Sequence, residues 1–174
     1  MSDYRRVYVP GGTYFFTAVT ADRRPWLGSP DGLDAFRTAY RRVVRDRPFE
    51  TIAVVVLPDH VHCIWRLPDG DAAFASRWKR LKRRTTELLR VRGHEGPFWQ
   101  KRYWERLIRD EADLHVHMDY VHYNPVRHGL VARASDWSAS SIHRYIRSGW
   151  YAADWGVADV RALEAAVLGR GGDA

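Results

Sequence analysis

Apolar residues in the first part of the chain follow strand-like spacing in three segments and helical spacing in one. Residues 13–20 are rich in aromatic and β-branched side chains, which predicts a first strand. A Ser-Pro pair opens a stretch of helical spacing over 29–46, which predicts an amphipathic helix. A β-branched run at 51–57 predicts a buried strand, and alternation at 60–67 predicts its antiparallel partner across a Pro-Asp turn.

The next part of the chain repeats this order and adds one helix. Helical spacing over 74–92, ended by a glycine, is followed by an alternating strand at 103–108. Asp110 is typical of the N-cap of a third helix, which we expect to end near Asn124 because Pro125 disfavours a helical residue before it. The order βαββαβ predicts an α+β, ferredoxin-like fold: a four-stranded antiparallel sheet with two helices on one face, and an extra C-terminal helix free to cover the other face or edge.

Length and composition indicate one folded domain. The chain has 174 residues, 45% of them apolar, and no repeat or low-complexity linker divides it. We expect a single domain over 1–174, with a core over about 11–131 and a C-terminal extension over about 132–174. In that extension we expect a short helix at about 159–168 before a glycine-rich end.

The same composition excludes several classes of protein. Cys63 is the only cysteine, so an internal disulfide and a thiolate metal cluster are excluded. The longest apolar run is far shorter than the roughly 20 residues that span a bilayer, and no secretory signal is evident. We therefore expect no membrane partner and a cytoplasmic protein.

A positive charge points to a polyanionic partner. The net charge is +7, and 13% of the residues are aromatic, a combination suited to phosphates and unstacked bases. Residues 77–92 contain eight cationic side chains and only one acidic side chain, Glu87. This imbalance favours a helix face that binds DNA over one that is merely solvated. The candidate DNA contacts there are Arg77, Lys79, Arg80, Lys82, Arg83 and Arg84.

Two segments carry side chains suited to catalysis. His60 and His62 are two positions apart in a strand, so both imidazoles lie on one face and form half of a metal site. On the third helix, His117, Tyr120 and Asn124 share one stripe, and the Asn124 carbonyl could supply a third ligand. Alternatively, the histidine pair lies on a half-exposed polar sheet face. On the helix, His117 would then be a surface histidine, Tyr120 a packing ring and Asn124 the residue that ends the helix.

Longer motifs resemble one family. The chain resembles the REP-associated tyrosine transposases, which are relatives of the single-tyrosine HUH insertion-sequence transposases and have a ferredoxin-like core. The motifs that carry this resemblance are YRR at 4–6, GGTYFF at 11–16, RPFE at 47–50, LPDHVHCIW at 57–65, WQ at 99–100, YWE at 103–105, DYVHYNPVRHGL at 119–130 and DW at 136–137.

The resemblance implies an activity and roles for particular residues. It implies that single-stranded DNA is cleaved and rejoined at REP-type hairpins through a 5′-phosphotyrosine, as in DNA transposition and recombination. It makes Tyr120 the nucleophile and His60, His62 and Asn124 the metal ligands, with His117 a candidate for supporting them. Mixed imidazole and amide ligands suit Mg²⁺ or Mn²⁺ at a phosphate.

Several alternatives stay open from the sequence. Tyr123 is a second tyrosine near the motif. A protein that only binds hairpin DNA, without cleaving it, and a metal-dependent hydrolase that does not need Tyr120 are the competing functions. The extension favours a monomer, and a DNA partner implies association with the nucleoid.

Overall fold

The computed structural model describes residues 7–156 and has the predicted order of strands and helices. The strands are β1 (Thr13–Val19), β2 (Glu50–Val56), β3 (His60–Arg66) and β4 (Trp104–Leu107). The helices are α1 (Pro30–Asp46), α2 (Phe74–Val91), α3 (Glu111–Arg127) and α4 (Ile142–Arg147).

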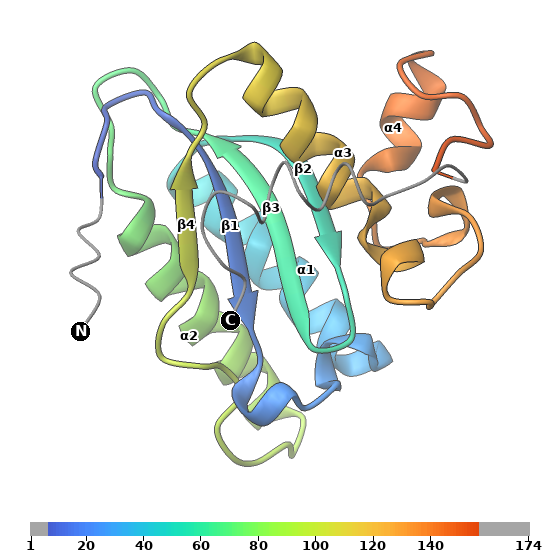
Figure 1. The fold of residues 1–174 in the computed structure, drawn as a ribbon. Helices are drawn as coiled ribbons and strands as arrows, with labels where there is room; N and C mark the ends of the chain where they lie inside the picture. Colours follow the sequence, from blue (N-terminus) through green and yellow to red (C-terminus); the bar gives the residue numbers. More distant parts are fainter. Residues whose placement is uncertain (1–6, 157–174) are drawn as a thin grey trace, which may run out of the picture.

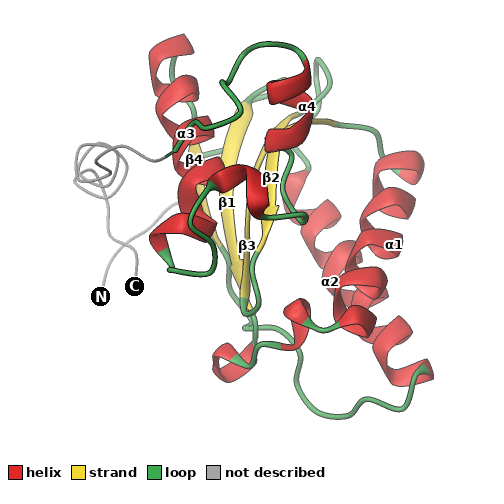
Figure 2. Ribbon diagram, turned by 90° about the vertical axis from the view of Figure 1, so that its right-hand side faces the viewer, coloured by secondary structure: helices red, strands yellow, loops and turns green. Residues whose placement is uncertain are grey.

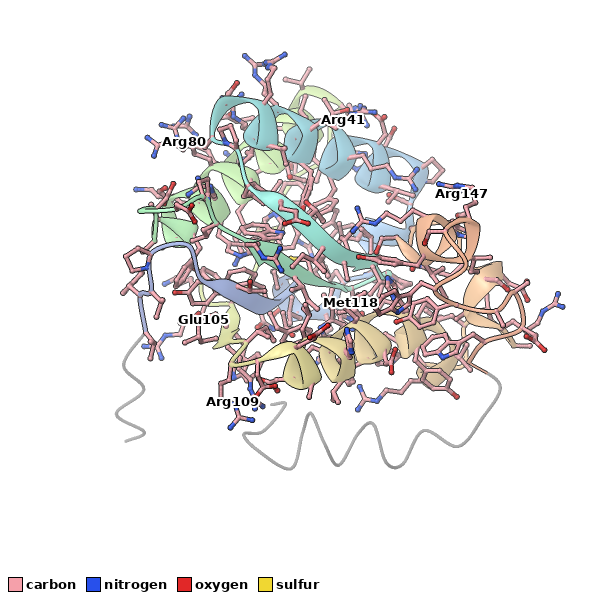
Figure 3. All side chains as sticks on the ribbon, turned by 90° about the horizontal axis from the view of Figure 1, so that it is seen from above. Arg41, Arg80, Glu105, Arg109, Met118 and Arg147 are labelled. Atoms are coloured by element: carbon pink, nitrogen blue, oxygen red, sulfur yellow. The ribbon has the colours of Figure 1, made fainter. Side chains whose placement is uncertain are left out.

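The strands form one antiparallel sheet in the order β2-β3-β1-β4. Helices α1 and α2 cover one face, and α3 covers the other, so the molecule has three layers (Figures 1 and 2). Figure 3 looks along these layers and shows Met118 between α3 and the sheet. The predicted ferredoxin-like fold is therefore confirmed, and the extra helix takes the face that α1 and α2 leave open.

Local sequence explains how the helices begin. The Ser29 side chain accepts a hydrogen bond from the Gly32 amide at the start of α1, and the Asp110 side chain accepts one from the Asp113 amide at the start of α3. Under α1 and α2 the core is aromatic: Trp65 of β3 stacks on Trp78 of α2 with ring centroids 4.7 Å apart. Both predicted helix starts are confirmed.

Helix α3 continues past the position where we expected it to end. Pro125 lies inside α3, which runs on to Arg127. Tyr123, Asn124 and Pro125 are all buried, so packing of the last turn outweighs the local preference against a helical residue before proline. The predicted end near Asn124 is wrong, and the extra turn adds Arg127 to the face that carries Tyr120.

The described part of the C-terminal extension pairs with the outer edge of the sheet. The Val56 amide donates to the Ala139 carbonyl at 2.9 Å, and the Ser141 amide donates to the Val54 carbonyl at 2.8 Å. This pairing covers the free edge of β2, and α4 follows it (Figure 1). The helix expected at 159–168 lies outside the described residues. Within residues 7–156, none of the helices combines the length and apolar character needed to cross a membrane.

Candidate active site

The two histidines of β3 face α3, and each is oriented by a neighbour. His60 Nδ1 lies 2.6 Å from an Asp59 carboxylate oxygen, and His62 Nδ1 lies 2.8 Å from the Thr17 hydroxyl. Thr17 is the register partner of His62 on β1. With Nδ1 of each ring engaged in this way, Nε2 is the nitrogen through which either histidine could bind a metal.

The electrostatics favour a neutral His62. Burial lowers its pKa well below the usual value, the nearness of His60, His128 and Arg127 acts in the same direction, and a hydrogen bond with the Asn124 side chain acts against them. Burial by itself would raise the pKa of Asp59, but hydrogen bonds from His60 and Arg23 outweigh burial and lower it. At neutral pH the site therefore pairs a carboxylate with His60 and keeps the His62 ring in the uncharged form that metals bind.

Helix α3 places Tyr120 and Asn124 against these rings. The rings of Tyr120 and His62 meet edge to face with centroids 5.3 Å apart, and both side chains are almost completely buried. Asn124 is fully buried, and its Nδ2 donates to the Tyr120 backbone carbonyl at 2.9 Å. The Asn124 side chain also interacts with the His62 ring, and no other partner of its buried Oδ1 atom is found among residues 7–156. An amide oxygen beside an imidazole suits a shared metal ion.

A cavity of about 220 Å³ opens beside the histidine pair. It is lined by Thr17, Val19, Arg23, His60, His62, Arg127 and His128. Among residues 7–156, no group of three or more His, Cys, Asp and Glu side chains has metal-binding geometry. A cavity with two arginines and three histidines in its lining suits a phosphate group.

The structure separates His117 and Tyr123 from this cavity. His117 is fully buried, its Nδ1 lies 2.7 Å from the Asp113 carbonyl oxygen, and its ring contacts Phe15, which also contacts His62. Burial lowers the pKa of His117. Tyr123 points toward the C-terminal extension, with its ring 6.4 Å from that of Trp155. Of the two tyrosines, Tyr120 is thus the one whose ring contacts a histidine of the pair.

Comparisons with known proteins identify the family of the chain. A family model described as "Transposase IS200 like" matches residues 8–124, a span that contains both histidines, Tyr120 and Asn124. Over 155 residues the chain is 46% identical to the REP-associated tyrosine transposase of Escherichia coli (strain K12). The matched region covers 89% of this chain and 91% of that protein. The chain belongs to the REP-associated tyrosine transposases.

Two further relatives support the same family. A Haemophilus influenzae protein named for this family is 43% identical over 167 residues, covering 90% of this chain and 94% of the relative. A solved structure of a REP-associated tyrosine transposase bound to a REP hairpin has a TM-score of 0.81 and 45% identity, covering 93% of this chain and 96% of the other.

In this REP-associated tyrosine transposase, one of the six cations expected to contact DNA points into the protein and not toward solvent. Arg77 is only 2% exposed and points inward from α2. It makes a bidentate ion pair with Asp71, at 3.1 and 2.7 Å, and donates to the carbonyls of Arg47 and Pro48. Its expected place on the outer face is wrong, because helical rotation points it at the loop that joins α1 to β2.

The other cations of α2 differ in how far they reach solvent. Lys82 donates to the Gln100 and Arg102 carbonyls, and Arg84 pairs with Asp46 at 2.8 Å. Arg80 points away from the sheet in Figure 3, while Lys79 and Arg83 are exposed. A groove of about 340 Å³ runs between α2 and the loop at 96–101, and its lining includes Lys82, Arg83, Arg90, Trp99 and Lys101.

Sequence reasoning missed the residues that support the histidine pair. Asp59 belongs to the predicted Pro-Asp turn, and its place next to His60 is the signal that could have revealed its contact with that ring. Thr17 could not be found without the pairing of β1 with β3. Arg127 was hidden by the wrong end of α3, because its spacing from Tyr120 is informative only if the helix continues.

Proposed function

We propose that this chain cleaves and rejoins single-stranded DNA at REP-type hairpins, with Tyr120 as the nucleophile that forms a 5′-phosphotyrosine. The observation that carries the proposal is the contact between Tyr120 and His62 beside the buried Asn124 amide, which also interacts with the His62 ring. A tyrosine suits reversible cleavage because phenol, with a pKa of about 10, is a better leaving group than an alcohol. The relative solved with a REP hairpin supports the substrate class.

His60, His62 and Asn124 would hold one Mg²⁺ or Mn²⁺ ion. When bound, the ion would supply Lewis-acid chemistry at the scissile phosphate. Asp59 and Thr17 orient the two imidazoles for this task through their contacts with Nδ1. His117, buried on the same helix and in contact with Phe15, supports the position of α3 against the sheet.

The Tyr120 side chain carries out the transfer. Its oxygen attacks phosphorus in line, the bond from phosphorus to the 3′-oxygen breaks, and the 5′ end stays attached to the tyrosine. A free 3′-hydroxyl can later attack the same phosphorus and displace Tyr120.

The exposed cations of α2 and the groove beside them would hold the phosphate backbone of the DNA. The exposed Lys79 and Arg83 and the half-buried Arg80 supply charge, and Trp99 in the groove offers an aromatic surface. Lys82 and Arg84, which are partly held by protein partners, are weaker candidates for DNA contacts. Since Tyr120 and His62 of one chain already meet, we propose that a monomer acts, which size-exclusion chromatography with light scattering tests.

A covalent-adduct assay tests the proposed activity. Labelled hairpin DNA with a single-stranded flank is incubated with the protein and Mg²⁺ or Mn²⁺, then separated on a denaturing gel. We expect an adduct that disappears in Tyr120→Phe, persists in Tyr123→Phe and is lost when the metal is chelated. Hairpin binding without an adduct would instead indicate a protein that only binds DNA, and cleavage that survives Tyr120→Phe would indicate a hydrolase.

A further inference from the structure

Arg127 connects the tyrosine with the cavity beside the histidine pair. It follows Tyr120 by seven residues on α3, which is two helical turns, so both side chains lie on one face. Arg127 Nη1 donates to the Tyr120 hydroxyl oxygen at 3.1 Å, and its guanidinium carbon lies 5.5 Å from the centre of the tyrosine ring. Arg127 lines the cavity together with His60 and His62.

We propose that Arg127 is a catalytic residue that stabilises the negative charge on the Tyr120 oxygen during strand transfer. The inference rests on the proposed function. A guanidinium stays protonated at all relevant pH values, so its hydrogen bond strengthens as the phenolic oxygen becomes anionic. The donor is already placed on the reacting oxygen before DNA arrives, which is the geometry of a preorganised electrostatic contact.

The same contact serves cleavage and rejoining. In cleavage, the bond from the Tyr120 oxygen to phosphorus forms, the bond from phosphorus to the 3′-oxygen breaks, the phenolic proton passes to water and the 3′-oxygen takes a proton from water. In rejoining, a 3′-hydroxyl attacks phosphorus and gives its proton to water, the bond from the Tyr120 oxygen to phosphorus breaks, and the leaving phenoxide then takes a proton from water. Arg127 cannot accept the phenolic proton, so it acts on charge alone. Both directions pass through charge on one oxygen, and both should slow when Arg127 is removed.

Arg127→Ala separates this role from DNA binding. With labelled hairpin DNA and Mn²⁺, we expect adduct formation about 100-fold slower than in the unchanged chain, comparable to the loss of one oxyanion donor. We expect the dissociation constant for the hairpin to change by less than about 3-fold, because Arg127 contacts the tyrosine oxygen and the cations of α2 would hold the phosphate backbone. Added guanidinium ion should partly restore Arg127→Ala and should leave Tyr120→Phe inactive.

Two other variants complete the experiment. Arg147→Ala removes the same charge from an exposed position at the end of α4. Its rate of adduct formation should stay within about 2-fold of the rate of the unchanged chain. Arg127→Lys keeps a positive charge without the planar guanidinium, so its rate of adduct formation should lie between those of the unchanged chain and Arg127→Ala. It also carries the test if Arg127→Ala does not fold, which circular dichroism reports.

The outcomes separate the inference from the proposed function. Adduct formation by Arg127→Ala at the original rate would overturn the inference and leave the proposed function standing. Weaker hairpin binding with an unchanged rate at saturating DNA would make Arg127 a DNA contact, which also overturns it. Absence of an adduct in both the unchanged chain and Arg147→Ala would overturn the proposed function itself.

Discussion

Replacing Arg77 by alanine should destabilise the fold and leave DNA binding nearly unchanged. The guanidinium is 2% exposed and joins α2 to two other parts of the chain: Asp71 before α2, and the Arg47 and Pro48 carbonyls between α1 and β2. Removing one partner of a buried ion pair costs about 3–5 kcal/mol. Because the Asp71 side chain is 30% exposed and regains water, we expect about 3 kcal/mol.

Urea unfolding followed by circular dichroism measures this loss. For a chain of this size, about 3 kcal/mol lowers the melting temperature by roughly 6–12 °C. Lys79→Ala is the matched control, since Lys79 is an exposed cation of the same helix and should change stability by no more than about 0.5 kcal/mol. An Arg77→Ala protein as stable as Lys79→Ala but weaker in hairpin binding would refute the structural role and restore Arg77 as a DNA contact.

The pH dependence of the same variant gives a second check. The hydrogen bond from Arg77 holds the pKa of Asp71 below its usual value. A lowered folded-state pKa contributes stability above the unfolded value of about 3.9, and that contribution is lost as the pH falls through the folded value. The stability difference between the original chain and Arg77→Ala should therefore narrow in acid. A difference that stays constant down to low pH would contradict the ion pair with Asp71.

Three further variants test other parts of the structure. Asp59→Asn removes the carboxylate on the neighbouring histidine and should weaken Mn²⁺ binding about 10–100-fold by calorimetry; unchanged affinity would exclude an orienting role. Gly32→Ala would place a Cβ 1.8 Å from the Trp26 carbonyl oxygen, so it should cost at least about 1–3 kcal/mol in urea unfolding, and a neutral result would contradict this packing. Arg83→Ala with Arg90→Ala should lower the slope of log affinity against log salt by about 1.4–1.8, while an unchanged slope would place the DNA elsewhere.

Local patterns were sufficient for the order of elements and for half of the candidate site. Strand alternation has a period of two, so His60 and His62 had to share a face wherever β3 lies in the sheet. Ser29 and Asp110 cap their helices through bonds that span three residues, which is why the helix starts were correct. Such features depend on neighbours in the chain.

The errors arose where distant packing decides the outcome. Arg77 belongs to a charged run in which the sequence does not distinguish one cation from another. Only its contacts with the loop between α1 and β2 show that it is a buried structural residue and not an exposed DNA contact. Pro125 disfavours a helix locally, but burial of the last turn of α3 outweighs that preference. Both depend on contacts between residues far apart in sequence, whose free energies exceed the local preferences.

The sequence by itself determined the elements, the shared face of the two histidines and, through its motifs, the family. The tertiary structure decided which side chains meet. It set Tyr120 of α3 against His62 of β3, aligned Thr17 of β1 with the same ring, and extended α3 so that Arg127 reaches the tyrosine oxygen. The physical reason is that a periodic pattern defines the face of an element, whereas sheet order and helix packing define what that face touches.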